Sequence, residues 1–204
     1  MPRVALIVLA AVLLAGCGSS SAAKVDAPPQ QAARFAGGEV TPPKPAPAIA
    51  LHDVTGKAVT LAGQHGRLVL VTFLYTHCPD VCPLIAQNLN AALRRLGPAE
   101  RAQVRVLAVS VDPKGDTPPA VHAYAKRLKL LPQFRYLLGT KAELRTVWTA
   151  WHVLAVQQGP DLVDHVAYTA LVDGSGRERV LYGSQVQAHE VLHDLRLLTK
   201  RTKA

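Results

Sequence analysis

The sequence predicts an α/β domain, in which a central mixed β-sheet is flanked by helices on both faces. Two runs of aliphatic, β-branched and aromatic residues, at 68–75 and 104–111, are typical of strands buried on both faces of a sheet. Apolar residues at helical spacing follow each of these runs. Two further strand patterns and an amphipathic helix lie near the end of the chain. This alternation indicates a sheet covered by helices.

The composition limits the classes to which the protein can belong. With 204 residues, 49% of them hydrophobic and 18% charged, the chain suits one globular domain with appendages and is too apolar to be disordered. Three cysteines are too few for a disulfide-rich scaffold. Aromatic residues make up 5% of the chain, which is few for a protein that stacks on single-stranded nucleic acid. The net charge of +9 is spread over several predicted helices, and we expect no nucleic-acid partner.

The N-terminus has the features of a secretory signal. Residues 4–15 form an apolar run behind a basic residue, and this run is shorter than the roughly 20 residues that a spanning helix requires. The sequence Leu14-Ala15-Gly16-Cys17 resembles the lipobox of bacterial lipoproteins, whose cysteine becomes the lipid-modified first residue. We therefore expect a lipoprotein signal peptide at 1–16 and a lipid anchor on Cys17 that holds the protein at the cell membrane, facing the extracytoplasmic side. An ordinary cleaved signal with an incidental cysteine is the alternative.

A change in composition marks the start of the folded domain. Residues 17–47 are rich in Ser, Ala, Gln, Gly and Pro, so we interpret them as the lipidated cysteine and a flexible, Pro-rich tether. We place the domain at 48–204, beginning with a small hairpin at 49–53 and 58–61. The other predicted elements are strands at 68–75, 104–111, 134–138, 167–172 and 178–182, and helices at 84–96, 118–131, 141–151 and 187–200. A βαβ unit followed by ββα is the thioredoxin arrangement, here with the N-terminal β-hairpin as an extension.

The segment between the first buried strand and the next helix carries two cysteines. Cys78 and Cys82 are separated by three residues. Pro79 disfavours helical backbone at Cys78, and Asp80 is a good helix N-cap, so we expect Cys78 in a loop and Cys82 in the first helical turn. The positive end of a helix dipole favours the thiolate, which is the form that binds metal or attacks a disulfide. A close cysteine pair in an exported protein can be a disulfide, a redox dithiol or a metal site.

A histidine lies where a thioredoxin topology brings a third group to the cysteines. The loop that enters the strand at 167–172 faces the cysteine segment in that topology and normally carries a proline. Here Asp164 and His165 stand close to that position. Two thiolates and one imidazole form a three-ligand set that suits Cu(I), whereas a structural zinc site requires a fourth ligand. Asp164 is placed to orient the imidazole or to act on it electrostatically.

Three stretches together resemble the SCO/SenC family of cytochrome c oxidase assembly factors. They are FLYTHCPDVCP at 73–83, VSVDP at 109–113 with DTP at 116–118, and Asp-His at 164–165 with Leu-Val-Asp at 171–173. The resemblance implies a thioredoxin-like fold with copper, as Cu(I), Cu(II) or both, bound by Cys78, Cys82 and His165. It also implies a metallochaperone that serves the dinuclear copper centre of the oxidase, with the copper-accepting subunit of a haem-copper oxidase as its partner.

The cysteine pair supports other interpretations as well. The alternative function is a thiol-disulfide oxidoreductase that keeps acceptor cysteines reduced, in which Cys78 attacks and Cys82 resolves the mixed disulfide. A permanent disulfide between Cys78 and Cys82 is the structural interpretation, because two cysteines so spaced at a helix start can approach closely enough to be bridged. If the protein is an enzyme rather than a carrier, we expect thiol-disulfide exchange to be its activity.

Three other polar features have structural interpretations. His77 adjoins the cysteine pair, but strand alternation directs it to the opposite side, so we expect a supporting role. The motif from His189 to His193 matches the H-E-x-x-H pattern of zinc proteases, yet it lies in the terminal amphipathic helix with 11 residues after it. Asp112 and Asp116 flank a turn beside the predicted site, where turn formation and capping account for them as well as a functional role does.

Overall fold

The computed structural model describes residues 35–157 and 163–201. The strands are β1 (Gly38–Pro45), β2 (Ala50–Asp53), β3 (Ala58–Thr60), β4 (Leu68–Leu74), β5 (Val104–Ser110), β6 (Phe134–Leu138), β7 (Ala155–Gln157), β8 (Val163–His165), β9 (Thr169–Val172) and β10 (Arg177–Tyr182). The helices are the 3₁₀ turn η1 (Ala62–Gln64), α1 (Val81–Arg95), α2 (Pro98–Ala102), α3 (Pro118–Arg127), α4 (Lys141–Ala150) and α5 (Ala188–Arg201).

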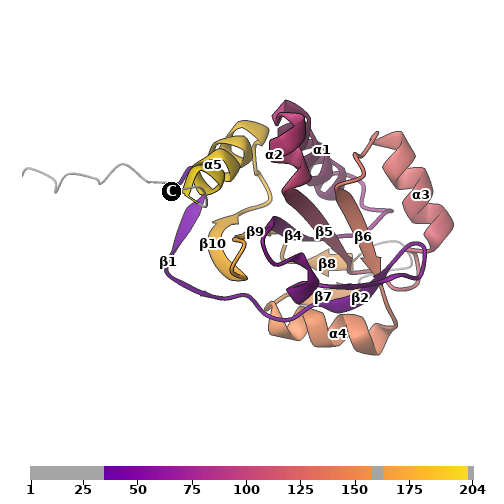
Figure 1. The fold of residues 1–204 in the computed structure, drawn as a ribbon. Helices are drawn as coiled ribbons and strands as arrows, with labels where there is room; N and C mark the ends of the chain where they lie inside the picture. Colours follow the sequence, from indigo (N-terminus) through magenta and orange to yellow (C-terminus); the bar gives the residue numbers. More distant parts are fainter. Residues whose placement is uncertain (1–34, 158–162, 202–204) are drawn as a thin grey trace, which may run out of the picture. The chain divides into compact units, whose positions relative to one another are not determined.

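One mixed sheet forms the centre of the domain, in the order β1-β10-β9-β4-β5-β6-β2-β3. Strands β4, β5 and β6 are parallel, whereas β9 runs antiparallel to β4. Helices α1, α3 and α5 lie over one face of the sheet and α4 over the other (Figure 1). This arrangement confirms the predicted thioredoxin-like α/β fold, and the β2–β3 hairpin confirms the predicted N-terminal extension.

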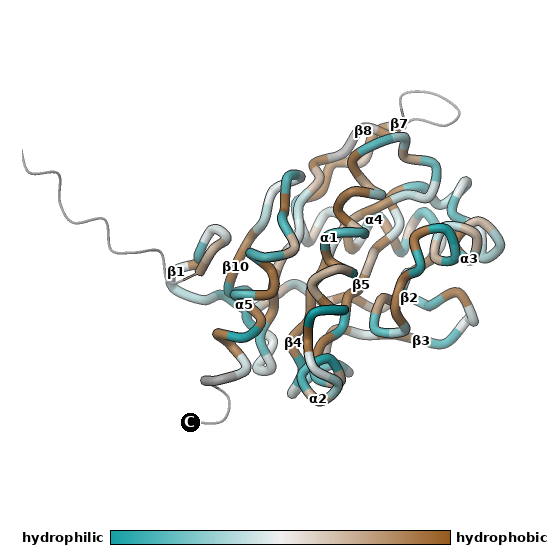
Figure 2. Tube along the Cα trace, turned by 90° about the horizontal axis from the view of Figure 1, so that it is seen from above, coloured by the Kyte–Doolittle hydropathy of each residue, from teal (hydrophilic) through white to brown (hydrophobic). Residues whose placement is uncertain are grey.

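The two central strands supply the core. All seven residues of β4 are buried, and six of the seven in β5. These strands appear as brown segments in the hydropathy view, between helices whose turns alternate between brown and teal (Figure 2). Strands covered by helices on both faces have no polar face, and this explains why the continuous apolar runs identified them in the sequence.

The N-terminal edge of the domain differs from the prediction. Residues 38–45, which the composition placed in the tether, form β1 and pair with β10. Phe35 is completely buried, and the carboxylate of Asp194 accepts hydrogen bonds from the amides of Ala36 (2.8 Å) and Gly37 (3.1 Å). The folded domain therefore includes residues well before position 48, because a Pro-rich segment can serve as an edge strand.

The predicted targeting segment lies outside the described residues. This applies to the signal at 1–16, to Cys17 and to the start of the tether, all of which stay predictions. Within the described ranges, no helix combines the length and the apolar character that crossing a bilayer demands.

Three smaller elements also differ from the prediction. A Gly-Pro pair ends α1 as expected, but Pro98 then begins the short helix α2, where its missing N–H costs nothing. Strands β7 and β8 form a separate two-stranded sheet that the sequence analysis did not include. Helix α3 ends at Arg127, and Lys129 behind it has a positive φ of 50°.

Helix α4 begins with a capping box that should contribute measurably to stability. The Thr140 hydroxyl accepts from the Glu143 amide (3.3 Å) and donates to the Glu143 carboxylate (2.8 Å). Thr140→Ala is expected to lower the free energy of unfolding by about 1 kcal/mol in denaturant titration. Thr146→Ala, an exposed position in the same helix, is the matched control and should change stability by less than about 0.5 kcal/mol. Equal losses in the two variants would contradict the assignment of the cap.

Candidate metal centre

The cysteine segment joins the carboxyl end of β4 to the start of α1. The side chain of Asp80 accepts a hydrogen bond from the Val81 amide and caps the helix, as the sequence predicts. Cys78 lies in the loop and Cys82 is the second residue of α1. Ligand sites of open α/β sheets lie at this position, beyond the carboxyl ends of the parallel strands.

The two cysteines lie close together and are not joined by a disulfide in the structure. Cys78 is 8% exposed and Cys82 is fully buried. The amide of Cys82 donates to Cys78 Sγ at 3.3 Å. A hydrogen bond from the Cys82 thiol, together with backbone donors of the first helical turn, lowers the pKa of Cys78 to about 6. The same hydrogen bond and burial raise the pKa of Cys82. At neutral pH the pair therefore holds one thiolate, on Cys78, and one thiol, on Cys82.

Tyr75 connects the cysteine pair to the segment that carries the predicted histidine. Burial and the neighbouring Cys78, to which its hydroxyl is hydrogen-bonded, raise the pKa of Tyr75 to about 12. The backbone of Val163, the first residue of β8, also hydrogen-bonds Tyr75. Strand β8 is thereby held next to the cysteine loop, and Val163 is itself buried.

The register of the sheet also brings the cysteine loop, which follows β4, close to the chain that precedes β9. Thr72 of β4 is paired with Thr169 of β9, and their hydroxyls are 3.1 Å apart. Because these strands are antiparallel, the chain before Thr169 passes along the residues that follow Thr72. The backbone of His165 is paired with Ala155 in the β7–β8 hairpin. The side chains of Asp164 and His165 lie outside the described part of the chain, so their roles stay predictions.

The buried carboxylate of Asp116 holds the cysteine loop in position through hydrogen bonds. Asp116 is 4% exposed and accepts hydrogen bonds from the Thr76 amide (2.7 Å), the Ser110 hydroxyl (2.6 Å) and the Tyr136 hydroxyl (3.0 Å). Burial raises the pKa of Asp116, although these hydrogen bonds act in the opposite direction. Asp116 therefore connects the cysteine loop to β5 and β6. It does not cap α3, because the N-cap of that helix is Thr117.

His77 and Asp112 lie near each other beside the loop, His77 exposed and Asp112 buried. His77 is exposed, and its Nδ1 is 3.1 Å from the Thr76 hydroxyl. Asp112 accepts from the Lys114 amide at 3.2 Å, as expected for a turn-forming aspartate. A Cβ at Gly115 would be 2.2 Å from the Asp112 carboxylate and 3.1 Å from His77 Nδ1, so only glycine fits between these two side chains.

The H-E-x-x-H motif is not assembled as a metal site. The Glu190 carboxylate accepts from the Gln187 amide (2.9 Å) at the start of α5, and His193 is largely exposed. Among the side chains that the structure describes, no group of three or more His, Cys, Asp or Glu is arranged to hold a metal ion. The side chain of His165 is not among those that the structure describes.

Sequence reasoning overlooked the roles of Tyr75 and Asp116. Tyr75 ends an apolar run, and the pattern predicts only that it is a strand residue. A tyrosine at the end of a buried strand, next to a reactive loop, can however offer its hydroxyl to that loop, and this was the available signal. Asp116 belongs to the DTP stretch at 116–118, where a polar residue between a strand and a helix predicts a turn. Its partners are 6, 20 and 40 residues away, so no local pattern identifies them.

The fold and this loop define a thioredoxin-like protein with a pair of unbridged cysteines at the start of α1. A profile of the SCO1/SenC family matches residues 43–200, and the chain belongs to this family. An SCO2-like protein of Rickettsia typhi is 26% identical over 155 residues, which cover 73% of this chain and 75% of the relative.

This chain is also similar to solved structures of Sco proteins. The solution structure of apo Sco1 from Thermus thermophilus is 35% identical, with a TM-score of 0.70, and the match covers 80% of this chain and 96% of that one. The structure of Bradyrhizobium japonicum ScoI with copper bound is 32% identical, with a TM-score of 0.66, and the match covers 75% of this chain and 98% of that one.

Proposed function

We propose that this protein is a copper-binding metallochaperone that serves assembly of the dinuclear copper centre of cytochrome c oxidase. In this proposal Cys78, Cys82 and His165 hold the copper ion, and Asp164 supports the imidazole. The observation that carries it is the hydrogen-bonded contact of Tyr75 with both Cys78 and the backbone of β8, the strand that contains His165.

The chemistry of the donors supports copper over other metals. Thiolates and imidazole are soft to intermediate ligands and select Cu(I), and a three-ligand set leaves the ion open for transfer by ligand exchange. The likeness to Bradyrhizobium ScoI, solved with copper bound, supports the same metal for this family member. Because both cysteines are buried, the domain would also limit the access of water to a bound ion.

A second candidate function, thiol-disulfide exchange, is favoured by the asymmetry of the two thiols. An attacking thiol should be accessible and ionised, and the resolving thiol buried and protonated. Cys78, with a pKa of about 6 and 8% exposed, is the more accessible and more readily ionised of the two thiols, and the fully buried Cys82 suits the resolving role. The two functions are compatible in one protein, because acceptor cysteines must be reduced before they take copper.

The proposed position in the cell follows from the N-terminal sequence. A signal peptide at 1–16 and a lipid on Cys17 would hold the domain at the extracytoplasmic face of the cell membrane. A copper-accepting subunit of a haem-copper oxidase is the partner that such a position and a soft-metal cargo suit.

Anaerobic copper titration tests the ligand set. The wild type should bind one Cu per chain, and His165→Ala should weaken binding by roughly 100-fold or more, because one of three ligands is lost. His122→Ala, an exposed histidine on α3, is the matched control and should bind like the wild type. Equal copper affinity in His165→Ala and the wild type would exclude the proposed site. Reductase activity that survives His165→Ala but is lost in Cys78→Ser would identify thiol exchange as a separate function.

A further inference from the structure

A polar cavity lies at the other end of the sheet from the cysteine loop. It has a volume of about 280 Å³. Its walls come from the β2–β3 hairpin, the η1 turn and the first residues of the parallel strands, and the lining residues are Lys57, Ala58, Val59, Thr60, Gly63, Gln64, Arg67, Arg105 and Arg135. Arg67 immediately precedes β4, and Arg105 and Arg135 are the second residues of β5 and β6. Parallel strands place these three side chains at one edge of the sheet.

The cavity has a strong excess of positive charge. Four of its nine lining residues are basic, and none of those that the structure describes there is acidic. Arg105 is partly buried, and burial together with the charges of Arg67 and Arg135 lowers its pKa. These three guanidinium groups are thus close enough to repel one another, and a bound anion would relieve that repulsion.

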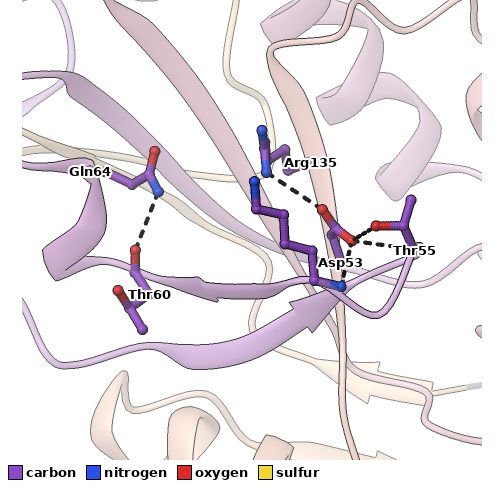
Figure 3. A network of polar contacts seen from close by, with 6 residues as sticks. Asp53, Thr55, Thr60, Gln64 and Arg135 are labelled. Atoms are coloured by element: carbon purple, nitrogen blue, oxygen red, sulfur yellow. Dashed lines mark hydrogen bonds and ion pairs between the residues drawn. The ribbon is translucent and has the colours of Figure 1, made fainter.

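The carboxylate of Asp53, which contacts Arg135, does not neutralise this cluster. Asp53 accepts from the Thr55 hydroxyl (2.6 Å), the Thr55 amide (2.9 Å) and the Lys57 amide (3.2 Å), which fix it in the hairpin turn. Its contact with Arg135 is a single one at 3.5 Å (Figure 3). Among the ion pairs that the structure describes, Asp53 therefore pairs with Arg135 alone of the four basic residues that line the cavity.

The cavity also holds its donors in place. Arg105 donates through Nη1 to the carbonyl oxygens of Ala102 (3.0 Å) and Val104 (2.7 Å), so its guanidinium is anchored to the backbone. Gln64 donates to the carbonyl of Thr60, and the Thr60 hydroxyl accepts from the Gly63 amide, so its own hydrogen can donate elsewhere (Figure 3). Fixed guanidinium groups bind anions at a lower entropic cost than free side chains do.

We propose that this cavity is a binding site for a phosphate group, held by Arg67, Arg105 and Arg135. Guanidinium groups bind phosphate oxygens in pairs, and several of them together match a tetrahedral dianion better than a planar carboxylate. The site is independent of the proposed copper function, because the cysteine loop follows the opposite end of β4. Two sources can supply the group: a soluble phosphate, or the headgroup of an anionic phospholipid.

Binding assays on the full chain distinguish these sources. Inorganic phosphate is titrated at constant ionic strength and followed by calorimetry. In parallel, binding is measured to phosphatidylcholine vesicles with and without phosphatidylglycerol, so that the difference reports the anionic headgroup alone. Arg67→Gln combined with Arg135→Gln should weaken binding by roughly tenfold or more, because two charge-assisted contacts are lost. The double variant Arg67→Lys, Arg135→Lys should lose less binding affinity, because both positive charges remain.

The matched control removes the same charge elsewhere. Lys126→Gln combined with Arg145→Gln changes two exposed residues on α3 and α4 and should leave binding unchanged. Binding of inorganic phosphate that depends on Arg67 and Arg135 supports the site with a soluble ligand. The same dependence with phosphatidylglycerol vesicles alone supports a lipid headgroup. The proposal is overturned if neither probe binds. It is also overturned if the Arg67→Gln/Arg135→Gln variant and the Lys126→Gln/Arg145→Gln control lose binding equally, since the attraction would then be that of a basic protein in general.

Discussion

Replacing Cys78 or Cys82 by Ser is expected to weaken copper binding by roughly a thousandfold or more, the largest loss of any ligand substitution. A serine hydroxyl is smaller, harder and stays protonated at neutral pH, so it does not replace a thiolate. Both variants should unfold cooperatively, which circular dichroism checks, because the exchange of sulfur for oxygen changes little volume. Retention of wild-type copper affinity in either variant would contradict the proposed ligand set.

The two cysteines should also differ in the protons that they release. At pH 7 Cys78, with a pKa of about 6, is already a thiolate, whereas the raised pKa of Cys82 keeps that thiol protonated. Metal binding requires both thiolates, so copper uptake should release about one proton at pH 7. Since a proton is released, copper affinity should rise with pH through the neutral range. Calorimetry in buffers of different ionisation enthalpy measures this proton, and its absence in the wild type would contradict the assignment of the protonated thiol to Cys82.

Local sequence patterns predict those elements whose structure depends on residues that are close together in the chain. Strands β4 and β5 were evident because burial on both faces requires continuous apolar runs. The positions of Cys78 and Cys82 followed from Pro79 and Asp80, which act on backbone within a few residues. The cysteine pair as the candidate centre could therefore be identified before any coordinates.

Long-range pairing could not be predicted in the same way. Strand β1 is held by β10, more than 130 residues further along the chain, and its own Pro-rich sequence resembles a tether. Strands β7 and β8 are three residues each and have no alternation long enough to be recognised. The contact of Tyr75 with Val163 depends on this unrecognised hairpin, so the strongest support for a three-ligand centre was available only from the fold.

Asp116→Ala is expected to destabilise the protein by about 3–5 kcal/mol, because three buried donors lose their acceptor at once. These donors are the Thr76 amide and the hydroxyls of Ser110 and Tyr136. Asp112→Ala is the matched control. Asp112 is equally buried, at 3% exposed, but its carboxylate accepts from the Lys114 amide alone among the hydrogen bonds described, so a cost of about 1 kcal/mol is expected.

Asp116→Asn separates the loss of the hydrogen bonds from the loss of the charge. The amide oxygen can still accept from Thr76, and the hydroxyls of Ser110 and Tyr136 can accept from the new NH₂ group. Burial raises the pKa of Asp116, which means that the ionised form is disfavoured inside the domain. Replacing the carboxylate by a neutral amide should therefore cost little stability. Denaturant unfolding should therefore rank the variants wild type, Asn, Ala. Because Thr76 lies two residues before Cys78, copper affinity should fall in the same order, and an Ala variant with wild-type stability and affinity would show that Asp116 does not position the loop.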